Sequence, residues 1–457
     1  MKKLIVGVDV AEAKFDVAFR DINCQPVRAD LSFSNSSDGI RDLIGCCIAS
    51  ASLAGKKVKI VIGMESTSNF HKNLERALRD SSRNFEIHVI NPLAIKQFKK
   101  MNLKVYKTDK LDAHMIASYL ARMEPNPSFA PLPGQEELKE LTRLRRSYLE
   151  ETTQLKNRIR SLLRIHFPGY KRLLGTKISS KMLIAFSNYS SPEEIISTGI
   201  DTLAEFSVSF RHRIGRPFAE NLVRLAGKAP SRVLPGGIAL AIKWTAQSLL
   251  QLQERIKMLD AEIVAMLDEY FPEHKLLSIP GIGPISAAAI IAEVGDIKRF
   301  STPEKFIGYI GLYPVVWESG EMKTRFQMTY KGNKSLKMTF LVATAAARQF
   351  NPAIRQMYDR LRARGKSKRA AGGAVARKLA CIVYAILAGD KKWDPEIASE
   401  GLRKSQQMAE SLTEKKERNE LPTEVVPQNA VIAAMEFNGQ RRSPGNSILN
   451  GGATGNP

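Results

Sequence analysis

Cysteine and negative charge are both scarce in this chain of 457 residues. Its four cysteines, Cys24, Cys46, Cys47 and Cys381, have neither metal-ligand spacing nor the pattern of a disulfide framework. We interpret the adjacent Cys46 and Cys47, which lie in an apolar helical stretch, as buried thiols, and we expect a reduced, intracellular protein. A zinc module and a disulfide-stapled secreted fold are therefore excluded as interpretations.

Long apolar runs are also missing, because no stretch reaches the ~18 apolar residues that a membrane span needs. The first residues resemble a signal peptide only briefly. Asp9, Glu12 and Asp16 interrupt the apolar run, and the segment alternates like a strand. We expect a cytoplasmic protein without a membrane partner.

Positive charge is abundant. The formal net charge is +23, the isoelectric point is about 9.8, and 44% of the residues are hydrophobic. The body is therefore globular, and a polyanion is the favoured partner, with nucleic acid as the first candidate. Ribosomal-type proteins and proteins that bind anionic membranes share this balance, so charge alone does not identify the partner.

Residues 1–125 read as an α/β domain. Three strand-like runs with short polar breaks predict an antiparallel meander, and helices and strands alternate after it. The predicted strands are 4–11, 15–21, 27–34, 58–65 and 85–90, and the predicted helices are about 38–53, 69–82 and 108–122. This is the order of the ribonuclease-H-like fold, although actin-like sugar kinases begin in the same way.

The rest of the chain is predicted to be helical. A proline-rich linker opens the segment 126–274, where apolar residues at a three-four spacing over 141–162 and 249–270 predict long coiled-coil helices that pair within one chain or between chains. The weakly patterned stretch of about 170–236 reads as an inserted subdomain. Residues 275–390 read as a compact helical domain, and 400–457 as a disordered tail.

Four carboxylates carry the catalytic hypothesis. Asp9 lies inside the first apolar strand, and Glu65 ends the strand 58–65. Asp109 and Asp112 are three residues apart at the start of a helix, which places them on one face. If these acids converge, two divalent cations, Mg²⁺ or Mn²⁺, would relieve their repulsion and set up attack on a phosphodiester. A helix cap at Asp109 and a satisfied strand-end acid at Glu65 are the structural alternatives.

Nearby polar groups receive simpler interpretations. We interpret Glu12 and Asp16 as surface or supporting acids. His71 and His114 are interpreted as packing or polar contacts and not as metal ligands.

The domain 275–390 carries features of a nucleic-acid binder. SIPGIGPISAAAIIAEVGD has the form of a helix-hairpin-helix, in which Gly281 and Gly283 allow a tight turn and free backbone N–H groups can hold a phosphate. Residues 320–378 hold fifteen Lys or Arg against two acids. A phosphate backbone would satisfy this excess, and the binding candidates are Lys323, Arg325, Lys331, Lys334 and Lys337.

Ser319, in YPVVWESGEMKTRF, could attack phosphorus and hold DNA as a phosphoserine. Nothing in the local spacing proves this, and a turn serine is the simpler interpretation.

Seven motifs in order carry a resemblance to a known family. They are GVDVAEAKFDV, IGMESTSNF, INPLAIKQF, KTDKLDAHMIA, SIPGIGPISAAAIIAEVGD, FIGYIGLYPVVWESG and YKGNKSLK. The chain resembles the DEDD transposases of bacterial insertion sequences, which are bridge-RNA-guided recombinases with Piv-type DNA invertases among their relatives. The resemblance covers about 1–125 and 275–390.

The resemblance implies a RuvC-like domain with Asp9, Glu65, Asp109 and Asp112 as the metal-binding tetrad and Ser319 as the nucleophile. It implies donor and target double-stranded DNA as substrates, a structured guide RNA, and a homo-oligomer (dimer or tetramer) that joins the metal site of one subunit to the serine of another. Strand exchange would pass through 5′-phosphoserine links and a Holliday junction. The chain departs from the family in its length, through 170–236 and the tail, so the RNA-binding elements are not assigned.

Three alternatives stay open at this point. A Holliday-junction resolvase-like nuclease would need the four carboxylates but not Ser319. A guide-free DNA invertase would share the chemistry without the RNA. A nucleic-acid-binding protein left by a decayed element would need neither.

Overall fold

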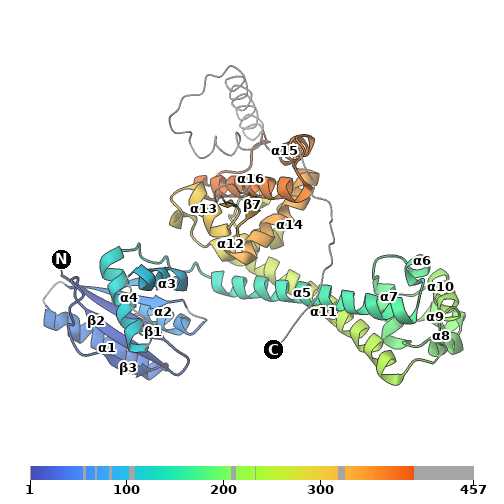
Figure 1. Cartoon of the computed structure of the whole chain (residues 1–457), viewed down its shortest axis with the longest axis horizontal. Coiled ribbons are helices and arrows are strands. Elements are labelled where there is room, and N and C mark those ends of the chain that lie inside the picture. The colour runs from blue at the N-terminus through green and yellow to red at the C-terminus, as the bar shows by residue number, and fades with distance from the viewer. Residues whose placement is uncertain are drawn as a thin grey trace, which may run out of the picture. The chain divides into compact units, whose positions relative to one another are not determined.

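The computed structural model describes residues 2–54, 58–66, 69–81, 85–101, 109–206, 213–231, 233–317 and 325–395. The chain divides into two compact units, 1–132 and 133–457, and each is described by itself (Figure 1). The predicted domain boundaries, including the tail 400–457, which lies outside the described residues, stay predictions.

The first unit is built on a five-stranded mixed sheet in the order β3-β2-β1-β4-β5. Its strands are β1 (Lys2–Val10), β2 (Lys14–Arg20), β3 (Leu31–Ser34), β4 (Val58–Glu65) and β5 (Glu86–Ile90). The first three strands are antiparallel, and β1, β4 and β5 run parallel. The predicted ribonuclease-H-like order of strands is therefore confirmed.

Two pairs of helices cover the two faces of this sheet. One face packs on α1 (Ser37–Ala54) and α2 (His71–Asp80) through a cluster that includes Leu43 and Leu74. The other face packs on α3 (Pro92–Met101) and α4 (Asp109–Met123). The sequence analysis did not predict α3, although Asn91 caps its start by accepting from the Leu93 backbone N–H at 2.9 Å.

The second unit is mostly helical and contains two long helices, α5 (Gln135–His166) and α11 (Gly236–Tyr270). These helices pack against each other within the chain, and Arg145 of α5 pairs with Asp260 of α11. The apolar stripes of the sequence thus meet, at least in part, inside one chain.

Five short helices lie between the two long ones. They are α6 (Tyr170–Leu174), α7 (Ser180–Asn188), α8 (Pro192–Thr198), α9 (Ile200–Glu205) and α10 (Arg216–Ala226). They share one core with the end of α5 and the start of α11, from Ile159 to Leu249. We call the five short helices, together with the end of α5 and the start of α11, the inserted lobe.

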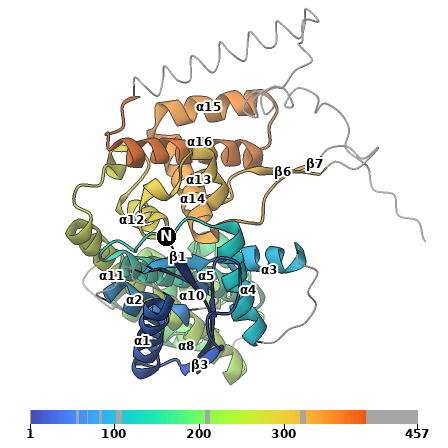
Figure 2. The ribbon, with the colours of Figure 1, turned by 90° about the vertical axis from the view of Figure 1, so that its left-hand side faces the viewer.

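The last part of the second unit has a core of its own. Its elements are the 3-10 turn η1 (Leu276–Ser278), α12 (Pro284–Val294), η2 (Ile297–Arg299), α13 (Pro303–Ile310), β6 (Pro314–Trp317), β7 (Arg325–Met328), α14 (Lys334–Phe350), α15 (Pro352–Ala363) and α16 (Lys368–Gly389). Figure 2 shows the hairpin of β6 and β7 extending away from the helices.

By length and composition alone, α16 is the one helix among the described residues that could cross a membrane. Val375, Leu379 and Val383 on α16 are fully buried against neighbouring helices. Its apolar character therefore matches its place in the middle of the helical core.

Candidate metal and strand-transfer site

Two neighbouring parallel strands deliver the first two predicted acids to one end of the sheet. Val8 of β1 pairs with Met64 of β4, and Asp9 and Glu65 are the next residues on these strands. Val8 and Met64 are buried on the α1–α2 face. Since side chains alternate along a strand, Asp9 and Glu65 project toward the opposite face, which α4 covers.

A glycine lets α4 approach this end of β1 closely. A Cβ atom on Gly7 would lie 2.1 Å from the Ala113 carbonyl oxygen and 2.6 Å from the Ala117 nitrogen, both on α4. This contact holds the second turn of α4 against β1, close to the carboxyl end of the strand. Asp112, the residue before Ala113, is therefore brought to the end of the sheet that carries Asp9.

Asp109 is the first residue of α4, and its side chain lies outside the described residues. The backbone thus places all four predicted acids, from three separate elements, at one end of the sheet.

A lysine from α3 already contacts one of these acids. Lys99 Nζ lies 2.6 Å from Asp112 Oδ1, and both side chains are about one-quarter to one-third exposed. The ammonium group partly neutralises this acid. The sequence analysis missed Lys99 because it missed α3, whose signals were Asn91 before Pro92 and the apolar pair Ile95 and Phe98.

A fifth acid lies next to the first one. Asp16 of β2 is directly opposite Asp9 of β1 and only 5% exposed. Lys14 Nζ donates to Asp16 Oδ2 at 3.0 Å. Asp16 is thus a buried group and not a surface acid, whereas Glu12 is exposed.

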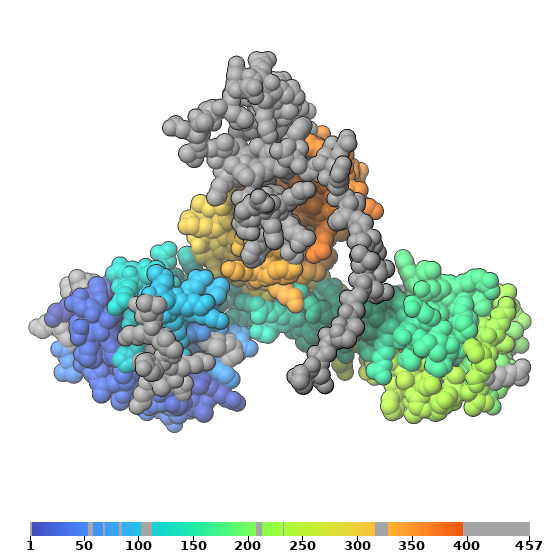
Figure 3. All heavy atoms as spheres, in the orientation of Figure 1, coloured from blue at the N-terminus to red at the C-terminus, as the bar shows by residue number. Residues whose placement is uncertain are grey.

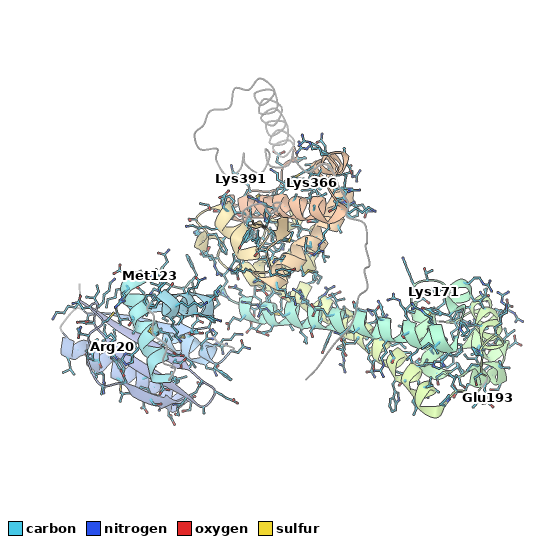
Figure 4. The ribbon with its side chains drawn as sticks, viewed as in Figure 1. Arg20, Met123, Lys171, Glu193, Lys366 and Lys391 are labelled. Atoms are coloured by element: carbon cyan, nitrogen blue, oxygen red, sulfur yellow. The ribbon has the colours of Figure 1, made fainter. Side chains whose placement is uncertain are left out.

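The histidines behave as polar and packing groups. His114 Nε2 lies 2.7 Å from Asp30 Oδ2, and both side chains contact Arg20, which is labelled on β2 in Figure 4. His71 is buried at the start of α2.

The chemistry of the acid set fits a hard divalent cation, because carboxylate oxygens are the ligands that Mg²⁺ and Mn²⁺ prefer. Within the side chains that the structure describes, no three His, Cys, Asp or Glu groups are close enough together to hold an ion. The side chain of Asp109 is not among them, and Asp112 is engaged by Lys99. The four predicted acids therefore fit a divalent metal in the type of their donor atoms and in the positions of their backbones.

The predicted nucleophile belongs to the hairpin of the second unit. Ser319 and Lys323 lie between β6 and β7, outside the described residues, and Arg325 is the first residue of β7. The two strands pair from Pro314 with Met328 to Trp317 with Arg325. The structure therefore shows the strands on either side of the serine segment and not the serine itself.

The base of this hairpin, which we call the hairpin root, is closely packed. The Thr329 N–H donates to the Tyr313 carbonyl oxygen at 3.1 Å. A Cβ atom on Gly332 would lie 2.7 Å from the Gly311 Cα, and both glycines have positive φ, 100° and 82°. Only glycine fits this crossing of the two chain segments.

A buried acid fastens the hairpin root to the helices. Glu293 of α12 is 1% exposed, and Arg143 of α5 donates to both of its carboxylate oxygens at 2.7 and 3.0 Å. Asn333 Nδ2 donates to Glu293 Oε2 at 2.8 Å, and Asn333 Oδ1 caps α14 by accepting from Leu336 N–H at 2.9 Å. Tyr309 OH donates to the Glu293 carbonyl oxygen at 3.2 Å. Glu293 thus joins four helices at the place where the hairpin begins and ends.

Burial by itself would raise the pKa of the Glu293 carboxyl. The hydrogen bonds from Arg143 and Asn333 and the charge of Arg143 outweigh burial, so its pKa lies below the ordinary value. The same contacts raise the pKa of Arg143. The sequence analysis missed Glu293, and the available signal was a lone acid within the apolar run AAAIIAEV.

The predicted phosphate-binding lysines occupy different positions. Lys337 Nζ donates to the carbonyl oxygens of Thr329 and Lys331 at 2.9 and 3.1 Å, and burial lowers its pKa. Lys337 therefore braces the hairpin root. Lys331 and Lys334 are exposed beside it.

The PGIG turn has one packed glycine and one open glycine. Gly281 has φ +99°, and a Cβ atom there would lie 2.3 Å from the Cα of Ala347 on α14. Gly283 is exposed at the start of α12. The segment before the turn forms only the 3-10 turn η1, so the first helix of the predicted hairpin is reduced to a single turn.

Comparison with known proteins gives two matches to family models. Residues 6–168 match a model described as a transposase, and residues 273–359 match one described as "Transposase IS116/IS110/IS902 family". Together the two matches span more than half of the chain.

Individual relatives agree with these models. The chain is 29% identical over 286 residues to an insertion element IS110 protein of Streptomyces coelicolor, covering 62% of this chain and 70% of that protein. It is 27% identical over 302 residues to an insertion element IS900 protein of Mycobacterium paratuberculosis, covering 63% and 73%. It is 22% identical over 400 residues to the pilin gene-inverting protein of Moraxella bovis, covering 87% and 99%.

The ribonuclease-H-like order of the sheet, the acids at its end and the two matches define a transposase-class enzyme that acts on DNA. The chain belongs to the IS116/IS110/IS902 family of transposases, and pilin gene-inverting proteins are distant relatives. A transposase of the DEDD type uses divalent metal in general, and its family binds DNA.

Proposed function

We propose that this chain is the transposase of an insertion sequence that cuts and rejoins DNA through a 5′-phosphoserine intermediate, guided by a structured RNA. The observation that supports this proposal is the backbone arrangement, in which β1, β4 and the start of α4 bring the positions of the four acids to one end of the sheet. Asp9, Glu65, Asp109 and Asp112 would hold the metal.

The covalent step exchanges one phosphodiester for another. Ser319 Oγ attacks phosphorus, the P–O3′ bond breaks, and the leaving 3′ oxygen takes up a proton. A 3′-hydroxyl of the partner strand later attacks the phosphoserine, and Ser319 regains its proton. Bound divalent metal supplies positive charge that stabilises the attacked phosphate and lowers the pKa of the attacking hydroxyl.

The residues of the second unit would position the serine. The hairpin root is fixed by Glu293, Asn333 and the Gly311–Gly332 crossing, so both ends of the serine segment start from an ordered base. The exposed Lys331 and Lys334 next to the root are suited to hold a phosphate backbone. The exposed start of α12 after Gly283 adds backbone N–H groups of the first helical turn beyond Pro284.

A homo-oligomer is part of the proposal. α5 and α11 keep exposed apolar side chains after packing together, such as Leu149 (41% exposed) and Met258 (65% exposed). Exposed apolar residues along long helices suit a coiled-coil contact with a second copy, which would join the acids of one subunit to the serine of another. Light scattering of the full chain, alone and with donor DNA, measures the number of subunits.

The serine role is tested with a Ser319→Ala variant and a matched Ser301→Ala control, since Ser301 is exposed and contacts only Lys305 in the same turn. With donor DNA and Mg²⁺, the native chain and the control should form a covalent protein–DNA adduct on a denaturing gel, and Ser319→Ala should form none. Cleavage by Ser319→Ala at the native rate would show that water is the nucleophile, as in a resolvase-like nuclease.

Guide-free DNA inversion is the second candidate function, because the similarity to a pilin gene-inverting protein spans 99% of that protein. Sequencing of RNA that copurifies with the full chain separates the two. A single structured RNA that restores recombination supports guidance, whereas recombination at full rate after ribonuclease treatment supports inversion without a guide.

A further inference from the structure

The inserted lobe contains a long segment without any acid. Residues 152–192 include no Asp or Glu and eight cations, which are Lys156, Arg158, Arg160, Arg164, Lys171, Arg172, Lys177 and Lys181. The acids of the lobe come later in the chain, on α8, α9 and α10. The lobe is therefore divided by charge along its sequence.

Six of these cations are exposed, and Lys156 and Arg160 are half-buried. Lys156, Arg160 and Arg164 follow one another at four-residue intervals on α5, so they share one face of that helix. Ile159 and Leu163, between them, are fully buried. The core thus fixes the direction of the basic face.

The basic face continues after α5 ends. In α6, Tyr170 and Leu174 are buried, while Lys171 and Arg172 between them are exposed. Lys177 and Lys181 are exposed in the next turn and at the start of α7. We call the eight cations the basic edge of the lobe.

Ion pairing distinguishes the basic edge from the rest of the lobe. Within the described residues, none of its eight cations forms an ion pair with an acid. Arg216 on α10, by contrast, pairs with Asp201 at 2.8 Å and with Glu220 at 3.3 Å. Arg216 is therefore neutralised by two acids, whereas no cation of the basic edge has an acid partner among the described residues.

One cation of the basic edge and one acid of α8 lie apart in space, whereas Lys181 lies beside Gly215 at the start of α10. Figure 4 labels Lys171 and Glu193 at opposite edges of the lobe. Figure 3 shows the same lobe as a surface, in green to yellow-green. Most of this lobe also lies between the two family matches, which end at 168 and resume at 273.

We propose that the basic edge binds the phosphate backbone of a nucleic acid. When unpaired cations contact a row of phosphates, the counterions condensed on the nucleic acid are released. This release favours binding that is independent of sequence. This binding surface is separate from the acids at the sheet end and from the hairpin. The proposal rests on the proposed function only because it assumes that the chain binds nucleic acid. The shared ligand is a phosphate backbone, from either RNA or DNA.

The first test uses the full chain in EDTA, so that no strand is cut. A Lys171→Glu/Arg172→Glu/Lys177→Glu variant is compared with a control that makes the same charge change on the acid-rich side, Arg216→Glu/Arg224→Glu/Lys228→Glu. Binding of 20-base-pair DNA and RNA duplexes of one sequence is measured against salt concentration.

Each lost phosphate contact removes about 0.9 from the slope of log affinity against log salt for DNA. The basic-edge variant should therefore lose about 2 to 3 units of slope, and the control should lose less than about 1. A loss confined to one duplex assigns the edge to RNA or to DNA. Equal losses in the two variants, or no loss in either, would overturn the proposal.

The second test needs no substitution, so it is independent of the folding of a variant. Lysine acetylation of the native chain is mapped by mass spectrometry with and without each duplex. Lys171, Lys177 and Lys181 should be protected several-fold, and Lys228 should not. Protection by anionic lipid vesicles but by neither duplex would contradict the proposal. Failure of Ser319 to form an adduct leaves this result unchanged, so the two hypotheses fail separately.

Discussion

The acids at the end of the sheet and the acid at the hairpin root solve the same electrostatic problem differently. Glu293 is a single buried carboxylate, and Arg143 and Asn333 satisfy it with three hydrogen bonds. At the sheet end, Lys14 pairs with Asp16 and Lys99 pairs with Asp112, and Asp9 and Glu65 lie near the ends of two neighbouring strands. A buried acid with its own arginine is structural, whereas several acids brought to one end of a sheet are suited to bind a cation from outside.

The two regions also differ in the contacts that hold the chain in place. At the hairpin root, hydrogen bonds fix the position of the chain. At the sheet end, a glycine contact does so, because Gly7 allows α4 to touch β1. The two regions should therefore respond to different substitutions.

The largest effect is expected from Asp9→Asn. Loss of one metal ligand should lower strand cleavage by on the order of a thousandfold, because a metal site contributes several kcal/mol to the transition state. Unfolding should occur at the same or a higher temperature, since one repelling charge is removed. The matched control is Asp38→Asn, an exposed acid paired with Arg41. Cleavage by Asp9→Asn at the rate of this control would remove Asp9 from the site.

The next effect is expected from Gly7→Ala. The new methyl group meets the backbone of α4, so the free energy of unfolding should fall by about 1–3 kcal/mol and Asp112 should shift. Denaturant unfolding and cleavage assays measure both. Gly45→Ala is the control, since nothing lies within 4 Å of its added Cβ on α1, and it should stabilise by about 0.5–1 kcal/mol. Equal stability of the two variants would contradict the close contact.

Glu293→Gln should destabilise the second unit by about 1–3 kcal/mol at neutral pH, because Arg143 loses its charged acceptor. The folded pKa of Glu293 is below its ordinary value of 4.5, so its stabilising contribution is complete above that value. It is lost as the pH falls through the lowered pKa. Urea unfolding from pH 7 to pH 3 should therefore show the native chain approaching the variant at acid pH. A difference that grows on acidification would contradict the contact.

The smallest effect is expected from Lys99→Met. Lys99 acts as a counterion for Asp112 when metal is absent, and a partly exposed pair of this kind stabilises by about 0–1 kcal/mol. Without metal, the free energy of unfolding should decrease by an amount within that range. The apparent Mn²⁺ affinity should rise by about twofold to fivefold, because a competing charge worth up to ~1 kcal/mol has been removed. Calorimetry measures both quantities. A clear loss of Mn²⁺ affinity would instead show that Lys99 stabilises the Mn²⁺-bound protein.

The sequence predicted the order of elements in the first unit, because period-two alternation in VGVDVA and the β-branched run VKIVIG are strong strand signals. It also placed Glu65 correctly at the end of its strand, whereas Asp9, predicted inside the strand 4–11, is the last residue but one of β1. It missed α3, where a short amphipathic pattern follows a proline, and so it missed Lys99.

Other features depend on long-range packing, so they could not be predicted from local sequence patterns. Asp16 is buried because β2 lies inside the sheet, between β1 and β3, and Glu293 is buried because four helices meet around it. The close approach of Gly7 to α4 joins residues more than one hundred positions apart. Local spacing carries no information on these contacts.

Titration of the full chain with Mn²⁺ by calorimetry most directly tests whether the acids of the sheet end converge on metal. The native chain and Glu293→Gln should show the same saturable binding, and Asp9→Asn and Glu65→Gln should lose it. Undiminished binding in both Asp9→Asn and Glu65→Gln would contradict the account.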